Sequence, residues 1–329
     1  MSRNYVSRNY GATKVAAHLL NTLTTIFIHG FTRSMALLPL PLNHVLGNLI
    51  GWLLWIVPNR NRSNALVNIK ICYPELEQSE QRQMARQSLL ETGKTVTEVG
   101  WFWFRKESDV RKKIIFPQED SAFRHVTSDS EQQNSGTDQT PTIFITPHFG
   151  AWELCPVLFS PFNTAYLYRP PRVAALEGLI KAGRTRYGGE LLAITSAGIK
   201  QLLRALRKGH SIGILPDQEP DRQNGVFAPF FSTPANTMTL LSSVGSRTQA
   251  NIVCLAIQRL PRGRGYHVHH IDVTQGITDA DPLVSATAIN RLVEACIAVE
   301  PAQYSWSYRR FRLMPDESEG KRSYKNKES

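Results

Sequence analysis

The second half of the chain alternates between stretches with the composition of buried strands and stretches with the period of amphipathic helices. β-branched and aromatic residues dominate the first kind, and apolar residues at helical spacing mark the second. Such alternation is typical of a parallel sheet covered by helices on both faces. We therefore expect an α/β fold with a mostly parallel central sheet. The predicted strands are 142–146, 164–168, 211–216, 251–260 and 265–273, and the predicted helices are 198–209, 238–249 and 286–301.

The first 58 residues are predicted to form a membrane anchor or a set of interfacial helices. The apolar stretch 35–57 is broken by prolines and asparagines, so it falls short of the about 20 uninterrupted apolar residues of a clean span. Trp55, close to Arg60 and Arg62, has the chemistry of a headgroup anchor. The pattern leaves open whether the segment spans once or lies in the interface, and a pair of buried helices in a soluble protein is the alternative.

Residues 59–315 are expected to form one α/β domain that begins with helices over 63–104, with Ser79 as an N-cap. The polar stretch 126–140 is nearly free of apolar residues and is predicted to be a flexible surface loop. Residues 316–329 are predicted to be a polar tail.

The net charge of +11 implies an anionic partner, such as a phospholipid surface, an acidic protein or substrate, or nucleic acid. No zinc-finger spacing, RNA-binding aromatic strand or basic zipper pattern is present, so we expect no nucleic-acid partner. The four cysteines have no metal-site or disulfide-framework spacing, and we expect them to be reduced, in a cytosolic compartment.

His148 and Glu153 follow the predicted strand 142–146, where α/β sheets place their sites. A histidine can take a proton from a hydroxyl at neutral pH if a partner holds its tautomer. Within one helix, a five-residue separation would turn the two side chains apart. If His148 lies in a loop and a helix starts near Ala151 or Trp152, Glu153 can fold back and accept from Nδ1 of His148. The alternative is a polar loop histidine and a carboxylate that complements the helix dipole.

Other chemistries fit the sequence less well. There is no GxSxG elbow, GxxxxGK[ST] phosphate loop, HExxH helix or GxGxxG turn. His267 and His269 share one face of a predicted strand, but an exposed strand explains them better than a metal site. We expect neither a metal nor a cofactor.

Several ordered blocks resemble the late acyltransferases of lipid A biosynthesis, the lauroyl- and myristoyl-transferring branch of the lysophospholipid acyltransferase superfamily. "HFGAWE" matches the family's His-x4-acid motif at His148 and Glu153. The other matching blocks are "RSNALVNIKICYPE" (62–75), "YRP" (168–170), "GRTRYGG" (183–189), "LPDQEP" (215–220), "GVFAPFFSTPANTMT" (225–239) and "QYSWSYRRFR" (303–312). The stretch 126–140 and the "QEPDRQN" segment depart from the family pattern.

The resemblance implies an acyltransferase fold and transfer of a fatty acyl chain from acyl carrier protein to a hydroxyl of a lipid A precursor. It places the enzyme at the inner membrane, with its catalytic domain on the cytoplasmic face. An acidic carrier protein, a phosphorylated acceptor and an anionic membrane surface all suit a basic enzyme. The alternatives are another glycolipid or phospholipid acceptor, or a membrane-surface binding protein without catalysis.

In this hypothesis His148 is the general base, and Glu153 fixes its tautomer. Arg169, or backbone N–H groups near Gly150, would stabilise the oxyanion, and Arg169 is equally suited to grip an acceptor phosphate. Further residues are assigned to substrate binding: Arg184 and Arg186 to phosphate or carrier protein, Asp217 to support of the acceptor site or of an arginine, and Phe230, with Phe227 and Phe231, to the acyl channel. Each residue also has a purely structural interpretation. The two arginines of 184–186 could lie on a solvated helix face, Asp217 could cap a turn, and the phenylalanines could belong to the core.

Overall fold

A computed structural model describes residues 22–116, 141–171, 174–245, 247–248, 250–316 and 324. Its central feature is a seven-stranded sheet in the order β1-β9-β8-β2-β5-β3-β4. Every neighbouring pair is parallel except β8 and β9. This confirms the predicted α/β class. The strands are β1 (Ile114–Ile115), β2 (Thr142–Ile145), β3 (Ala165–Tyr168), β4 (Glu190–Ala193), β5 (Ile212–Ile214), β8 (Asn251–Arg259) and β9 (Tyr266–Ile271).

Both faces of the sheet are covered by apolar clusters. Successive side chains of a strand point to opposite sides, so a single strand contributes to both clusters. In β2, Ile143 and Ile145 join one apolar cluster, and Phe144 between them joins the other. All four residues of this strand are buried, as expected for a central parallel strand. The unbroken apolar run "TIFI" therefore reflects burial on two sides.

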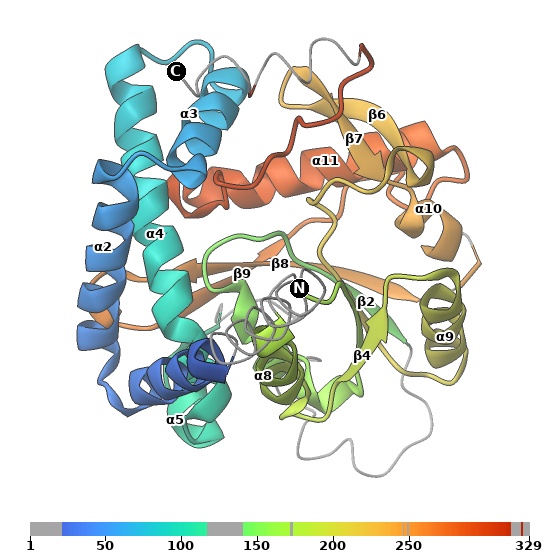
Figure 1. Cartoon of the computed structure of the whole chain (residues 1–329). Coiled ribbons are helices and arrows are strands. Elements are labelled where there is room, and N and C mark those ends of the chain that lie inside the picture. Colours follow the sequence, from blue (N-terminus) through green and yellow to red (C-terminus); the bar gives the residue numbers. More distant parts are fainter. Residues whose placement is uncertain are drawn as a thin grey trace, which may run out of the picture.

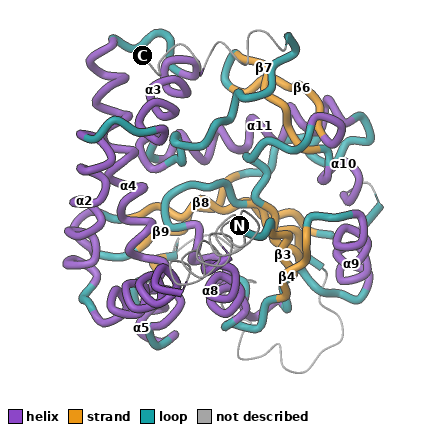
Figure 2. The backbone as a smooth tube through the Cα atoms, in the orientation of Figure 1, coloured by secondary structure: helices purple, strands orange, loops and turns teal. Residues whose placement is uncertain are grey.

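The helices lie on the two sides of the sheet, as Figures 1 and 2 show. The first cluster includes residues of α9 and α11, and the second includes residues of α8 and the end of α4. A two-stranded hairpin of β6 (Gly225–Phe230) and β7 (Thr233–Met238) packs against α11. The helices are α2 (Leu40–Ile56), α3 (Arg60–Cys72), α4 (Gln78–Phe104), α5 (Glu107–Arg111), α7 (Cys155–Leu158), α8 (Ala174–Thr185), α9 (Ser196–Arg207), α10 (Leu240–Gly245) and α11 (Pro282–Val299).

Four strands escape sequence prediction: β1, β4, β6 and β7. β1 and β4 are only two and four residues long, too short for a period of two to emerge. In the hairpin, Pro229 of β6 stands opposite Pro234 of β7, and proline usually argues against a strand. The predicted N-cap Ser79 is also displaced. α4 begins earlier, where Glu77 and Glu80 form a reciprocal capping box.

Glycines let α2 and α4 approach each other closely along their length. A Cβ on Gly47 would lie 2.5 Å from the Cα of Lys94, and one on Gly93 would lie 2.1 Å from the carbonyl oxygen of Gly47. Small residues four apart allow this kind of backbone approach. The two helices stand side by side at the left of Figure 1.

The opposite side of α2 is apolar and exposed, so this helix is inverted relative to an ordinary surface helix. Its inner face buries Asn43, His44, Gly47 and Gly51. We call the exposed set the outer face of α2: Leu42, Val45, Leu46, Leu49, Trp52, Leu53 and Ile56. Its spacing is that of a single helical stripe, and exposed apolar patches of this kind mark a binding surface.

Two described segments have the length and hydropathy of a membrane span. One is α11, half of which is buried against the core. The other is the pair α2 and α3, which bends by 82° at the break between them. Residues 22–37 are helical as well, and their exposed side chains include Phe27 and Leu37. The predicted loop 126–140, residues 1–21 of the anchor and nearly all of the predicted tail lie outside the described residues.

We expect Gly93→Val to destabilise the protein strongly, because the added side chain meets the backbone of α2. Overpacking of this kind typically costs about 1–3 kcal/mol, or more where backbone must move. Thermal unfolding in detergent measures it. The matched control is Gly178→Ala in α8, where a Cβ meets nothing within 4 Å. That change should stabilise the protein by about 0.5–1 kcal/mol. Equal effects of the two variants would contradict the close packing of α2 on α4.

Candidate active site

Three of the predicted site residues follow strands that end at one edge of the sheet, and two of them, His148 and Asp217, are in contact. β5 lies between β2 and β3, and these three strands run parallel. His148 follows β2, Asp217 follows β5 and Arg169 follows β3. Their carboxyl ends share one edge, which is where open α/β sheets place ligands. The sheet thus brings together side chains that are up to 69 residues apart in sequence.

Asp217 holds His148 through two hydrogen bonds. The backbone N–H of His148 donates to Oδ2 (2.9 Å), and Nδ1 of its ring lies 2.8 Å from Oδ1. Burial raises the pKa of Asp217, but the charge and hydrogen bonds of His148 outweigh burial, so the net pKa is lowered. An ionised Asp217 accepts a hydrogen bond from Nδ1–H, which leaves the lone pair of the imidazole on Nε2.

The predicted hydrogen bond between His148 and Glu153 is therefore wrong, because Asp217 takes that place. A short 3₁₀ helix, Trp152–Leu154, begins where expected, yet it directs Glu153 towards α8. There Arg184 donates to both carboxylate oxygens, from Nε (3.1 Å) and from a terminal nitrogen (2.6 Å). A guanidinium offers a buried carboxylate two charge-assisted bonds, and a neutral imidazole offers one.

The Glu153–Arg184 pair lies beside the ring of Trp152, which links it to His148. The Arg184 guanidinium stacks 5.3 Å from the centre of that ring, and the His148 ring packs 4.7 Å from it on an edge. Burial lowers the pKa of Arg184, but the charge and hydrogen bonds of Glu153 outweigh burial and raise it. Arg184 thus stays cationic at the edge of the site. Sequence analysis assigned Arg184 to substrate binding but did not predict its ion pair with Glu153.

The second ring nitrogen of His148 has a partner that sequence reasoning missed. The side-chain amide nitrogen of Gln218 lies 3.1 Å from Nε2. Gln218 belongs to the "LPDQEP" block and directly follows Asp217. Proximity to a candidate site residue was the only signal that could have singled it out.

The backbone N–H groups around Gly150 are engaged, so they do not form the expected oxyanion hole. Phe149 donates to the carbonyl of Pro147, Gly150 to that of Gln303 and Ala151 to that of Ile257. Gly150 has φ of +53°, and a Cβ there would lie 2.0 Å from the oxygen of Ile257. Only glycine fits this turn.

The C-terminal block 303–306 clamps the same loop from the other side. The N–H of Ser305 donates to the carbonyl of His148 (3.0 Å), and Tyr304 forms an isolated bridge with Phe149. The "QYSW" residues thus support the backbone of the site, which their place near the end of the chain does not suggest.

Arg259 of β8 ties this loop to the N-terminal helices from inside the protein. Its guanidinium donates to the carbonyl of Gly150 (3.0 Å), to both oxygens of Glu98 and to Glu91 of α4. His44 of α2 lies against the same Glu98. Burial raises the pKa of Glu98, but Arg259 and His44 outweigh burial and lower it from 4.5 to about 2. The pair is therefore ionised in the core.

The other predicted site residues lie outside this cluster. Arg169 is exposed beyond β3. Arg186 donates to the carbonyl of Trp103 (2.6 Å) and fastens α8 to the end of α4. Phe230 is 1% exposed and packs among Phe231, Tyr304 and Phe311, so its ring belongs to the core.

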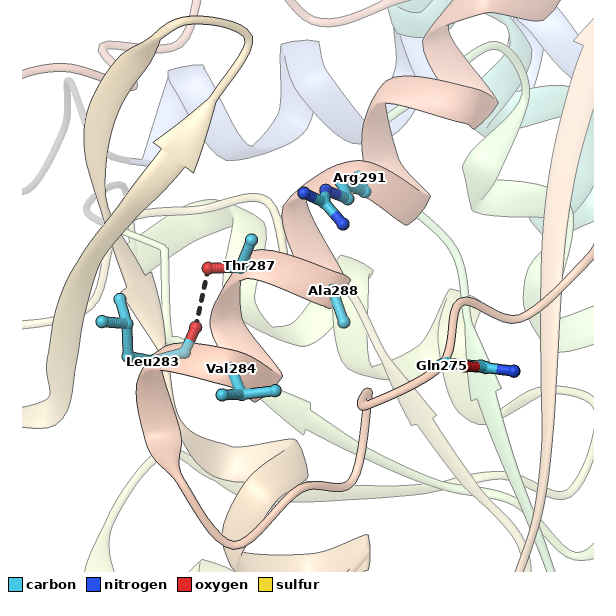
Figure 3. A pocket seen from close by; sticks show the side chains of 6 residues that line it. All are labelled: Gln275, Leu283, Val284, Thr287, Ala288 and Arg291. Atoms are coloured by element: carbon cyan, nitrogen blue, oxygen red, sulfur yellow. Dashed lines mark hydrogen bonds between the residues drawn. The ribbon is translucent and has the colours of Figure 1, made fainter.

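No metal centre is found among the described residues, since no three His, Cys, Asp or Glu side chains there converge. A hollow of about 230 Å³ beside α11 is separate from the cluster at His148. Figure 3 shows its lining, and none of the predicted site residues contributes to it. It is lined by Gln275, Leu283, Val284, Thr287, Ala288 and Arg291.

The family model described as bacterial lipid A biosynthesis acyltransferase matches residues 12–313, which include every residue of this cluster. The chain belongs to this family. It is 28% identical to a lipid A biosynthesis acyltransferase of Haemophilus influenzae, over 87% of this chain and 89% of that protein. It is 27% identical to the lipid A biosynthesis lauroyltransferase of Escherichia coli (85% and 88% covered) and 27% identical to the palmitoleoyltransferase of that organism (84% and 87%).

We expect Arg259→Met to destabilise the fold of this family member, because it leaves Glu98 buried without its counterion. Breaking one side of a buried pair typically costs about 3–5 kcal/mol. Since the folded-state pKa of Glu98 is below its ordinary 4.5, the stability from this carboxylate is present above about pH 4.5 and lost towards about pH 2. The loss of unfolding free energy caused by Arg259→Met, measured at several pH values, should therefore become smaller as the pH falls through that window.

The control for this prediction is Lys181→Met, which breaks an exposed pair with Glu177. An ion pair in solvent contributes little to stability, so this change should have a small effect. A pH-independent cost at Arg259, or one no larger than at Lys181, would contradict the ionised core pair.

Proposed function

We propose that this protein transfers a fatty acyl chain from an acyl carrier protein thioester to a hydroxyl of a lipid A precursor, with His148 as the general base. Family membership supports the acyl transfer and the lipid A acceptor. The observation that carries the mechanism is the Asp217–His148 hydrogen bond at the carboxyl edge of the sheet. It leaves Nε2 as the basic atom, directed away from its buried partner.

In this mechanism Nε2 of His148 takes the proton of the acceptor hydroxyl as its oxygen attacks the thioester carbonyl. Asp217 holds the tautomer and stabilises the imidazolium that forms, as the carboxylate of a catalytic triad does. General-base assistance of this kind is typically worth about 10²–10⁴-fold. Glu153 acts indirectly: it holds Arg184 against the ring of Trp152. In this position Arg184 binds the phosphate of the acceptor or of the carrier protein.

The state of the cysteines favours a direct attack of the acceptor hydroxyl on the thioester, without a covalent acyl-enzyme. All four cysteines are buried, and none forms a disulfide. Burial raises the pKa of Cys155 to about 12 and that of Cys254 well above its ordinary value. A thiol in such surroundings is a poor nucleophile. We therefore propose no covalent acyl-enzyme, and the acceptor hydroxyl attacks the donor itself.

We further propose that the enzyme works at the cytoplasmic face of the inner membrane, with the outer face of α2 in the bilayer interface. The other face of α2 is packed on α4, so α2 cannot cross the bilayer without carrying α4 with it. At the end of α2 the Arg62 guanidinium stacks 4.9 Å from the Trp55 ring. A cation beside an aromatic ring is typical of residues at headgroup depth, which supports this proposal. The net charge of +11 favours the anionic surface and an acidic carrier protein.

The catalytic proposal is tested with purified full-length protein, acyl carrier protein loaded with C12 or C14 chains and a lipid A precursor, with the product identified by mass spectrometry. We expect His148→Ala to lower transfer by about 10²–10⁴-fold and Asp217→Asn to lower kcat by at least about 10²-fold. Near wild-type transfer by His148→Ala would overturn the mechanism. Product formed only on another lipid would overturn the acceptor.

Double variants separate the role of Asp217 from that of Glu153. Glu153→Gln and Arg184→Met remove one shared contact, so the double variant should lose little more than either single one. Asp217→Asn and Glu153→Gln remove separate contacts, so their effects on the activation free energy should add within about 0.5 kcal/mol. Strong coupling between Asp217 and Glu153 would contradict the division of roles.

The membrane proposal is tested by placing charges on the outer face of α2. Val45 and Leu49 are each more than half exposed. If both are buried in lipid, each contributes about 1.5–3 kcal/mol, so Val45→Glu with Leu49→Glu should lower the vesicle partition coefficient by at least about tenfold. Co-sedimentation with vesicles of phosphatidylethanolamine and phosphatidylglycerol measures it. Leu283→Glu, on exposed α11 surface, is the control and should change nothing. Unchanged partitioning of the double variant would contradict the proposal.

A further inference from the structure

The resting position of Gln218 places a hydrogen-bond donor on the atom that must act as base. Nδ1–H of His148 is committed to Asp217, so Nε2 carries the lone pair. The amide nitrogen of Gln218, which can only donate, lies 3.1 Å from that lone pair. It therefore occupies the place that the acceptor hydroxyl needs.

The reaction also needs a donor for the oxyanion, and most nearby donors are committed. The N–H groups of Phe149, Gly150 and Ala151 are bonded to carbonyls, and Arg184 is bonded to Glu153 by two nitrogens. The exposed Gln218 amide is held instead by the lone pair of His148 Nε2, from which the acceptor hydroxyl displaces it. It becomes available at the moment the acceptor arrives.

From this juxtaposition, and resting on the proposed function, we propose that Gln218 is a catalytic residue that donates to the oxyanion of the thioester carbonyl. The acceptor hydroxyl replaces the amide at Nε2, and its oxygen bonds to the carbonyl carbon while its proton passes to Nε2. The carbonyl π pair moves to oxygen, and the amide of Gln218 donates to it. Collapse re-forms the carbonyl and breaks the C–S bond, and the proton on Nε2 passes to the departing thiolate.

The swing that this requires is short. The attacking oxygen and the oxyanion are bonded to the same carbon, so a donor that begins beside the base lies close to both. Glutamine has three side-chain torsions, and no packed neighbour has to move because Gln218 is exposed. The exposure also means that substitutions there leave the fold intact.

The test compares Gln218→Ala and Gln218→Glu with wild type in the transfer assay. Loss of one oxyanion donor typically costs about 10²–10³-fold in kcat, so we expect that loss for Gln218→Ala with KM for the acceptor nearly unchanged. Gln218→Glu should be no better, because a carboxylate has no proton to donate to an oxyanion. The matched control is Gln201→Ala, an exposed glutamine on α9. All variants should unfold at the wild-type temperature.

A kcat for Gln218→Ala within about threefold of wild type, or an increase in rate, overturns the inference. Arg169→Ala is measured alongside, and a kcat loss there in place of Gln218 assigns the oxyanion to Arg169. An active His148→Ala variant would instead overturn the proposed mechanism. A substrate-free readout is the ¹⁵N chemical shift of His148 Nε2, which should differ between wild type and Gln218→Ala. An identical shift overturns the contact whatever the substrate is.

Discussion

The guanidinium of Arg259 lies where three parts of the protein meet: the sheet, the N-terminal helices and the loop that carries His148. It belongs to β8, pairs with Glu98 of α4 and donates to the carbonyl of Gly150. A buried charge is tolerated only when its hydrogen bonds are satisfied, so each of these parts must sit where the pair requires. The loop geometry therefore depends on how α4 docks on the sheet.

The two acidic residues of the candidate site have different partners because their surroundings differ. Asp217 follows the central strand β5 and is 3% exposed, and the imidazole of His148 is its neighbour. Glu153 lies on a 3₁₀ turn facing α8, where Arg184 reaches both of its oxygens. The two residues of the His-x4-acid motif thus belong to different pairs, His148 with Asp217 and Glu153 with Arg184. The ring of Trp152 lies between them.

The inverted helix α2 connects the loop that carries His148 to the proposed membrane surface. Its glycines allow close contact with α4, and its buried His44 reaches Glu98, which in turn holds Arg259. Its outer face is left without a protein partner among the described residues. Two relatives of equal identity are named for lauroyl and palmitoleoyl transfer, so overall similarity to this scaffold does not itself set the acyl chain.

Sequence alone determined the α/β class, the central strands, the family blocks and the place of His148 at a strand end. These are local properties, since periodicity and strand burial are written in consecutive residues. It did not determine the pairing. The choice of Asp217 over Glu153, the role of Gln303 and Ser305 behind the loop, and the Gln218 contact join residues about 70 to 157 positions apart. Only the strand order β2-β5-β3 and the docking of α4 and α8 bring such residues together. Because hydrogen bonds are short and directional, that arrangement and not residue spacing selected the partner of the histidine.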